Sequence, residues 1–375
     1  MKVLLKSQLR FMSNYFEVVG ISSPGKELEE VHANEGVRTI PVKMERGISI
    51  GRDVKALWSL YKLMRKERPL IVHTHTPKAG LLGMIAARLT GVPVRLHTVA
   101  GMPLMEEKGM KRKLLVFTEK LTYKYATRVY PNSGNLARFI LDNKYCQNNK
   151  IKVLGNGSSN GIDTEYFKST SELVEKAAQL RESLGIQEND FVFVFVGRLV
   201  KDKGIEELTT AFSRLKQQHA SVKLLLVGPY EPELDPLSAE AHEIIKNDKD
   251  IIRVGFQQDV RPYLLLSQAL AFPSYREGFP NVPMQAGCFN LPSIVTNING
   301  CNEIVEHKKN GLIIPVKNVE ALLEAMELLL NDKALYLTLK TNARQSIVDR
   351  YDQQYIWNLL LNEYNDHLKS HEIVS

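Results

Sequence analysis

Short apolar runs alternate with longer amphipathic stretches along almost the whole of this 375-residue chain. Runs of strand length lie at 16–21, 70–73, 94–98 and 128–130 in the first half, and at 191–196, 223–227, 251–254, 269–272, 293–295 and 312–314 in the second. Strands that alternate with helices are typical of parallel sheets covered by helices on both faces. We therefore expect an α/β fold with two Rossmann-like domains and a cleft between them.

A segment rich in glycine, serine and asparagine separates the two series of strands. It has the sequence LGNGSSNGID at residues 154–163, a composition typical of a linker. We expect an N-terminal domain over 1–155 and a C-terminal domain over 156–352. The helical pattern at 353–368 is expected to pack back on the first domain.

The beginning of the chain departs from this pattern. A doubly wound domain normally opens with a strand, a glycine-containing turn and a helix. Here residues 3–12 have helical spacing, and 16–21 is the first good strand candidate. We expect that the first strand of the N-terminal domain is missing.

Composition excludes several classes of protein. The 44% hydrophobic and 24% charged residues are ordinary for a soluble globular protein. Cys146, Cys288 and Cys301 lack CxxC or CxxxC spacing, which argues against a disulfide framework or a zinc site and indicates a reducing cytoplasm. No apolar run reaches the roughly 18 residues of a membrane span, and no signal-peptide pattern opens the chain.

The stretch GRLVKDKG, residues 197–204, directly follows the strand expected at 191–196 and precedes a helical pattern at 205–215. In strand–loop–helix geometry, backbone N–H groups and the helix dipole can meet a phosphate. Arg198 and Lys203 flank the turn, and two such cations suit a diphosphate that is bound without a metal. The alternative is a surface loop with two solvated cations.

The stretch YREGFPNVPMQAG, residues 275–287, places a carboxylate just before a helix expected to start near Asn281. An ionised Glu277 accepts hydrogen bonds from hydroxyl groups. Backbone amides near the helix start can face an anion or a sugar, and Pro280 suits a first helical turn. The alternative is that Glu277 only stabilises the helix N-terminus.

Together these motifs resemble glycosyltransferase family 4, whose members are retaining, use nucleotide sugars and have the two-Rossmann GT-B architecture. GRLVKDKG is followed by PSYREGFPNVPMQAG and then by TNINGCNEIVEHKKNGLIIP. HTHTPKAGLLG (73–83), RLHTVAGMP (95–103) and GNGSSNGIDTEYF (155–167) are similar to further segments of the family. The resemblance covers nearly the whole chain and is best to bacterial capsule and O-antigen glycosyltransferases, which act on lipid-linked saccharides.

The resemblance implies a role for each matching residue. Arg198 and Lys203, after Gly197, would hold the donor diphosphate, and Glu277 would contact the transferred sugar. His97 would assist at the reacting centre, with a structural histidine as the alternative. Backbone at Gly278, Phe279, Pro280, Asn281 and Val282 would contact sugar and phosphate. The family's second Glu, which binds the ribose, is replaced here by Gln285, which offers hydrogen bonds without the charge.

Charge is distributed unevenly. Of 49 Lys and Arg and 42 Asp and Glu, residues 1–155 hold 27 and 12 (+15), so the remainder holds 22 and 30 (−8). A basic stretch, 108–125, places Leu114, Phe117, Leu121 and Tyr125 on one helical face and cations on the others. Such a helix can lie on an anionic bilayer, and the alternative is a core-packed helix with a solvated basic face. No nucleic-acid recognition pattern accompanies the charge.

We therefore expect a retaining hexosyltransferase that moves a sugar, with a UDP-sugar as the expected donor, to a lipid-carrier-linked saccharide in bacterial surface polysaccharide synthesis. It would work at the cytoplasmic face of the inner membrane, as a peripheral protein, with no metal and no cofactor besides the nucleotide-sugar substrate. Two alternatives remain at this point: a UDP-sugar 2-epimerase of the same architecture, and a non-catalytic nucleotide-sugar-binding protein.

Overall fold

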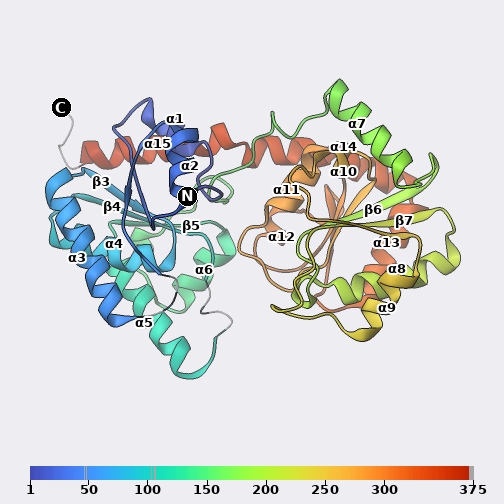
Figure 1. Ribbon diagram of the computed structural model, residues 1–375, viewed down its shortest axis with the longest axis horizontal. Coiled ribbons are helices and arrows are strands. Elements are labelled where there is room, and N and C mark those ends of the chain that lie inside the picture. The colour runs from blue at the N-terminus through green and yellow to red at the C-terminus, as the bar shows by residue number, and fades with distance from the viewer. Residues whose placement is uncertain (46, 48, 103, 105–106, 371–375) are drawn as a thin grey trace. The chain divides into compact units, whose positions relative to one another are not determined.

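The computed structural model describes residues 1–375 except 46, 48, 103, 105–106 and 371–375, and divides the chain into two compact units (Figure 1). Unit 1 comprises Met1–Gly161 together with Gln353–Ser375, and unit 2 comprises Ile162–Asp352. The chain crosses between the units at 161/162, six residues beyond the expected boundary, and again at 352/353. Pro103, the last residue of one family-like segment, lies outside the described residues.

Unit 2 is built on one six-stranded parallel sheet of order β11-β10-β9-β6-β7-β8. The strands are β6 (Phe191–Val196), β7 (Val222–Val227), β8 (Ile251–Gly255), β9 (Ala269–Phe272), β10 (Ser293–Thr296) and β11 (Gly311–Ile314). Its helices are α7 (Ser171–Ser183), α8 (Ile205–Gln218), α9 (Ala239–Asn247), α10 (Arg261–Leu265), α11 (Asn281–Cys288), α12 (Cys301–Ile304), α13 (Val319–Asn331) and α14 (Lys333–Tyr351).

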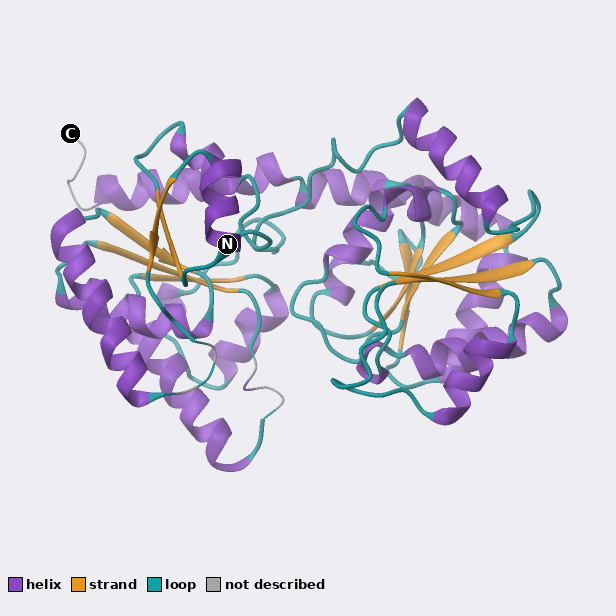
Figure 2. Ribbon diagram, in the orientation of Figure 1, coloured by secondary structure: helices purple, strands orange, loops and turns teal. Residues whose placement is uncertain are grey.

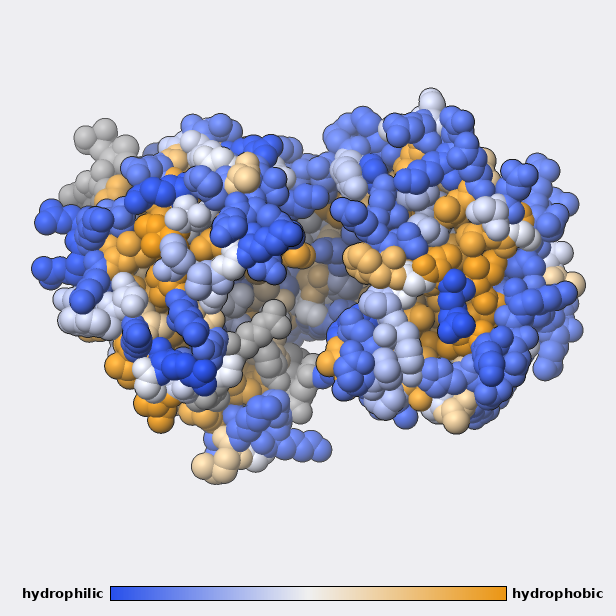
Figure 3. All heavy atoms as spheres, in the orientation of Figure 1, coloured by the Kyte–Doolittle hydropathy of each residue, from blue (hydrophilic) through white to orange (hydrophobic). Residues whose placement is uncertain are grey.

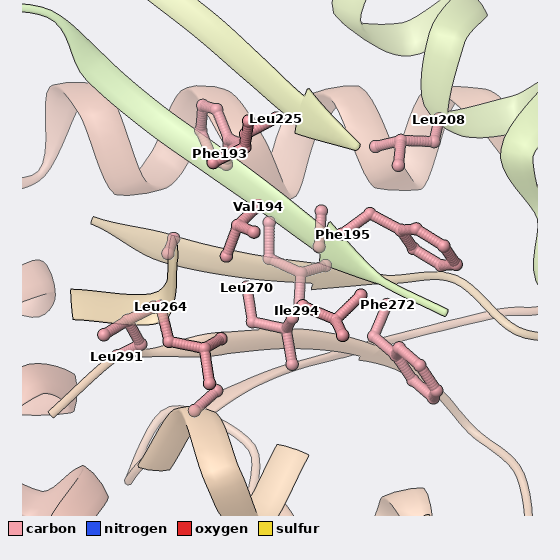
Figure 4. Close-up of a cluster of buried hydrophobic side chains, with 14 of the residues drawn as sticks. Phe193, Val194, Phe195, Leu208, Leu225, Leu264, Leu270, Phe272, Leu291 and Ile294 are labelled. Atoms are coloured by element: carbon pink, nitrogen blue, oxygen red, sulfur yellow. The ribbon is translucent and has the colours of Figure 1, made fainter. Parts of the chain in front are cut away.

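The core of unit 2 explains why β6 has an unbroken apolar sequence. Helices cover both faces of the sheet (Figure 2), so side chains on both sides of the central strand are buried. Phe193, Val194 and Phe195 on β6 are fully buried, with Leu270 on the neighbouring strand β9 and Ile294 on β10, the next strand beyond β9 (Figure 4). This packed sheet gives the loops at its carboxyl edge a rigid base.

Unit 1 has its strands in two separate parallel sheets. One pairs β1 (Val19–Ser22) with β2 (Arg38–Pro41), and the other has the order β3 (Ile71–Thr74), β4 (Val94–Val99), β5 (Arg128–Pro131). The helices are α1 (Gln8–Ser13), α2 (Lys26–Glu35), α3 (Ile50–Glu67), α4 (Pro77–Leu89), α5 (Gly109–Tyr125) and α6 (Gly134–Asp142). No strand precedes β1 in the part of the chain that the structure describes.

The last helix, α15 (Gln353–Ser370), belongs to unit 1. Its Tyr364 hydroxyl lies 2.7 Å from His73 Nδ1 on β3, and Glu363 accepts a 2.8 Å hydrogen bond from the Tyr130 hydroxyl on β5. Leu360 and Leu361 are buried with Met12 of α1. A helix at the end of the chain thus packs on the N-terminal strands.

The predicted fold class is confirmed, and each strand expected from the sequence occurs, with bounds that shift by three residues at most. β2 was not predicted, because its four residues, RTIP, lack an apolar run. The 108–125 stretch is a helix, α5, but its Leu114 and Phe117 are exposed rather than packed in the core. No helix among the described residues combines the length and the apolarity needed to cross a bilayer.

Candidate active site

The strand order of unit 2 reverses next to its first strand. The chain runs from β6 through β7 to β8 on one side, and then continues with β9, β10 and β11 on the other side of β6. In open parallel α/β sheets, ligands bind at the carboxyl ends of the strands where the order reverses. The loops 197–204 and 273–280 follow β6 and β9, so both predicted motifs lie at this point.

Lys203 and Glu277 form a direct ion pair across this point. The ammonium lies 2.6 Å from Glu277 Oε1, and both side chains are largely buried. Ser274, which is fully buried, donates a 2.9 Å hydrogen bond to the same carboxylate oxygen. The structure therefore brings together two of the residues that the sequence predicted, and adds Ser274, which the sequence did not single out.

Further contacts lock the two loops together. The Tyr275 backbone N–H donates to the Asp202 carbonyl at 2.8 Å, and the Arg276 guanidinium binds Asp202 Oδ2 at 2.9 and 3.0 Å. The Tyr275 hydroxyl donates to Glu207 on α8 at 2.7 Å, and burial raises the pKa of that hydroxyl. The site is thus held in shape by contacts that do not involve the Lys203–Glu277 pair.

Gly204 permits the close approach of these loops. It adopts φ +71° between the turn 201–203 and α8, and a Cβ added to it would lie 2.1 Å from the Pro273 carbonyl oxygen. Only glycine fits this conformation and this spacing without strain. The glycine that ends the GRLVKDKG motif thus has a physical reason, whatever ligand the site binds.

Arg198 lies in the same loop but points elsewhere. Its guanidinium is 3.5 Å from Glu231 Oε2 in the loop after β7, and 44% of the side chain is exposed. The backbone of this loop is fixed, because Leu199 N–H donates to the Pro229 carbonyl at 2.8 Å and Gly197 N–H donates to the Val227 carbonyl at 2.9 Å. The structure therefore shows no contact of Arg198 with Lys203 or Glu277, and its weak ion pair leaves the side chain able to reorient.

The helix that follows Glu277 begins where the sequence predicted. α11 starts at Asn281 with Pro280 as its N-cap residue, and no side chain caps it. Its first-turn N–H groups therefore carry the partial positive charge of a helix N-terminus. Asn281 and Gln285 are one turn apart on this helix, so they share a face, and both are at least partly exposed.

The loop after β10 contacts the turn that precedes α11. Asn299, after β10, donates a hydrogen bond to the Gly278 carbonyl. A Cβ on Gly300 (φ +75°) would lie 2.8 Å from the Gly278 oxygen and 2.9 Å from Phe279 Cα. Asn299 and Gly300 had no role assigned from the sequence. The available signal was an Asn-Gly pair in the loop after β10, separated from the end of the strand by two residues.

His97 lies in unit 1, within β4, and is 2% exposed. Its Nδ1 is 2.8 Å from the Thr74 hydroxyl, and a Cβ on Gly80 would fall 2.5 Å from its ring, so α4 packs directly on the imidazole. Burial lowers the pKa of His97 to about 4. The ring is therefore neutral at pH 7, and its expected part in the reaction stays a prediction.

Comparison with known proteins identifies the family. The Glycosyl transferases group 1 family matches residues 176–346, and the Glycosyl transferase 4-like domain matches residues 16–157. The chain is 35% identical over 371 residues to the capsular polysaccharide biosynthesis glycosyltransferase CapM of Staphylococcus aureus, covering 98% of this chain and 95% of that protein. The chain belongs to the group 1 glycosyltransferases.

Further relatives of this glycosyltransferase support the family assignment and the fold. It is 32% identical to the Escherichia coli UDP-Gal:alpha-D-GlcNAc-diphosphoundecaprenol alpha-1,3-galactosyltransferase, over 82% of this chain and 78% of that one. Its fold matches Anabaena Alr3699/HepE, solved in complex with UDP, with a TM-score of 0.78, 18% identity and 96% of each chain covered. A Rickettsia africae glycosyltransferase gives a TM-score of 0.81 at 20% identity, over 97% and 93% of the two chains. The GT-B fold is thereby established.

Family membership also decides between the alternatives left open by the sequence. The chain is a glycosyltransferase, so the family assignment favours the transferase over the epimerase and over the non-catalytic binding protein. Gly197, Arg198, Lys203, Glu277 and the 278–282 turn all lie in the unit matched by the group 1 family.

Proposed function

We propose that this glycosyltransferase transfers a hexose from a UDP-sugar to a saccharide carried on a lipid diphosphate. The observation that carries the proposal is the pairing of Lys203 with Glu277 at the strand-order reversal, beside the uncapped start of α11. A cation, a carboxylate and free helix N–H groups suit the diphosphate, the sugar hydroxyls and a phosphate oxygen of one donor. The printed names of the Staphylococcus aureus and Escherichia coli relatives support the acceptor class and the role in surface polysaccharide synthesis.

Each side chain has a separate task in this proposal. Lys203 and Arg198 bind the diphosphate, and Arg198 leaves Glu231 to do so. Glu277 then accepts hydrogen bonds from the transferred sugar, while Gln285 pairs with the ribose hydroxyls. Because Lys203 and Glu277 neutralise one another, the arriving diphosphate competes with Glu277 for the ammonium.

The reaction breaks the bond between sugar C1 and the diphosphate oxygen and forms a bond from C1 to the acceptor oxygen. The acceptor proton passes to the departing diphosphate, which leaves as UDP. Negative charge grows on the leaving group as the bond breaks, so Lys203 and Arg198 bind it more strongly in the transition state than in the ground state. We propose that the configuration at C1 is retained and that no metal is required. Activity in the presence of a chelator would test the second point.

We also propose that the protein works at the cytoplasmic face of the inner membrane. Helix α5 exposes Met110, Leu114 and Phe117, which recur at helical spacing. The one carboxylate in the helix, Glu119, is buried, and its exposed cations are Lys111, Arg112, Lys113, Lys120 and Lys124. Apolar side chains flanked by cations suit an anionic bilayer surface, where the lipid-linked acceptor resides.

The test is a screen of UDP-, GDP- and dTDP-sugars with lipid-linked acceptors from membrane extract, with products identified by mass spectrometry. Lys203→Met should reduce the rate by roughly 10²–10³, as expected when one oxyanion-stabilising group is lost. Lys201→Met is the matched control, since Lys201 lies in the same loop but pairs with Glu206. Equal rates for the two variants would contradict the role of Lys203. Donor binding without transfer to any of the lipid-linked acceptors would contradict the proposed acceptor class.

A further inference from the structure

Helix α3 presents an apolar row to the outside. Its Ala56, Leu60 and Met64 are buried, but Ile50, Val54 and Trp58 on another side are 81%, 60% and 56% exposed. A spacing of four residues places these three in one row along the helix. The Tyr61 ring stacks on Trp58, with centroids 5.3 Å apart and planes 7° from parallel. Single exposed apolar residues are common, but a continuous row that includes tryptophan indicates a contact surface.

Four exposed cations lie beside this row, without a carboxylate partner among the described residues. The exposed Lys55, Lys62, Arg65 and Lys66 lie on the outward half of α3, and the Lys62 ammonium lies 5.3 Å from the Trp58 ring centroid. Within the described part of the chain, none of the four has a carboxylate within ion-pair distance. The two acids of the helix are bound elsewhere: Asp53 binds Lys78 at 2.7 Å, and Glu67 binds Arg38 at 2.5 Å.

We propose that α3 is a second membrane contact of unit 1, in which Ile50, Val54 and Trp58 enter the headgroup region of an anionic bilayer and the four cations bind its headgroups. Tryptophan is favoured at the membrane–water interface. A cationic amphipathic helix binds there by burying its apolar side chains and by the attraction of its cations to anionic headgroups. The inference extends the proposed association through α5 to another helix. Helix α4 packs against both α3 and α5, and hydrophobic and charged side chains are interspersed over unit 1 (Figure 3).

Charge argues against a second copy of the chain as the occupant. Two α3 surfaces facing each other would bring the eight cations together, a like-charge arrangement that opposes association. An anionic lipid surface supplies the missing charge, at about 1 kcal/mol for each cation near the surface. An anionic bilayer is therefore the proposed partner of α3, and binding to an acidic protein is an alternative result of the experiment.

The chain supplies its own reporter for the test. Its two tryptophans are Trp58, which is exposed, and Trp357, which is 3% exposed and donates its indole N–H to Asn160 at 2.7 Å. Vesicles of phosphatidylcholine with phosphatidylglycerol should shift tryptophan emission to the blue, and lipids brominated on the acyl chain should quench it. Phosphatidylcholine alone should give a much smaller effect, because the cations then find no counter-charge.

Variants separate α3 from α5 and from catalysis. Val54→Glu should weaken partitioning onto the anionic vesicles about tenfold or more, since it removes apolar contact and adds repulsion. Val174→Glu, at an exposed valine on α7 of unit 2, is the matched control and should bind like the parent. Both should transfer sugar to a soluble short-chain acceptor at the parental rate. Phe117→Ser should weaken binding while the remaining bound protein keeps the Trp58 shift.

Three results would overturn the proposal. In the first, the protein sediments with vesicles while Trp58 emission stays unchanged and unquenched, which would leave α5 as the contact. In the second, Val54→Glu and Val174→Glu bind equally well. In the third, the emission shifts without vesicles as the chain self-associates, or only with an acidic protein. Loss of transfer to the soluble acceptor in the parent protein would instead contradict the proposed function, so the two failures are distinguishable.

Discussion

Three histidines of unit 1 are held in the neutral form, His97 in a buried position and His73 and His75 in partly buried ones. His73 and His75 stack with ring centroids 4.2 Å apart, and His97 lies between Thr74 and Gly80. Burial lowers the pKa of His75 to about 3 and of His97 to about 4, and lowers that of His73 well below its usual value. An imidazole that cannot gain a proton in the folded state makes folding depend on pH.

For His97 the direction of this dependence is fixed. In the unfolded chain its pKa is near 6.5, so between pH 6.5 and 4 the unfolded state binds the proton and the folded state does not. Stability is therefore fully present above pH 6.5 and is lost as the pH falls toward 4. Between pH 7 and pH 5, His97 should account for about 2 kcal/mol of lost unfolding free energy.

Urea unfolding of the parent and of His97→Gln at both pH values measures this contribution. The variant should be less stable at pH 7, because glutamine does not reproduce the packing against Gly80. Its unfolding free energy should nevertheless fall less than that of the parent between pH 7 and pH 5. Equal losses for the two proteins would show that His97 is not the neutral buried group described here.

The charged residues of the donor site were predictable, but their pairing was not. Lys203 and Glu277 lie in motifs with recognisable spacing, whereas their contact joins positions 74 residues apart and depends on β9 being next to β6. Ser274 and Asn299 gave little signal, since a serine or an asparagine after a strand is common in loops. The direction of the Arg198 side chain depends on Glu231, which follows a different strand.

At the scale of elements, two glycines with the same backbone conformation have different surroundings. Gly185 (φ +67°) follows α7 with open space around its Cβ position, while Gly204 (φ +71°) faces the Pro273 carbonyl at 2.1 Å. Gly185→Ala should cost about 1–2 kcal/mol of unfolding free energy from the left-handed conformation alone. Gly204→Ala should cost at least about 2 kcal/mol more, because the loops after β6 and β9 must separate.

Donor binding distinguishes the two substitutions further. Gly204→Ala should weaken UDP binding, since Lys203 and Glu277 move apart, and Gly185→Ala should leave it unchanged. Calorimetry on both variants under conditions where both are folded provides the measurement. Similar stability and similar UDP affinity for the two would mean that the close approach at Gly204 does not hold the site together.

The elements themselves were largely evident in the sequence, with an instructive exception. Long amphipathic helices and buried strands such as β6 carry a periodic or continuous apolar pattern, whereas β2 has four residues that include Arg38 and Pro41 and are only partly buried. A short edge strand derives little of its stability from its own burial, so its sequence carries little signal. The division of unit 1 into two sheets likewise depends on pairing between strands, which local pattern does not encode.

At the scale of the whole molecule, the second unit has what an independent domain needs. One continuous hydrophobic core runs through 162–352, and its six strands form one complete sheet. The two points where the chain enters and leaves are bonded to one another, because Ile162 N–H donates to the Tyr351 carbonyl at 2.8 Å and the Thr164 hydroxyl donates to Asp352 at 2.6 Å. Cutting the chain there breaks no strand and no helix.

We therefore expect residues 162–352, produced alone, to unfold in a single cooperative transition and to bind UDP within about tenfold of the full-length affinity, a difference of about 1.4 kcal/mol. The residues proposed to hold the diphosphate all lie in this segment, so the loss of unit 1 removes none of them. Lys203→Met in the same fragment is the control and should bind weakly. A fragment that folds but binds UDP no better than this control would mean that unit 1 supplies part of the nucleotide site, and the assignment of donor binding to unit 2 would be wrong.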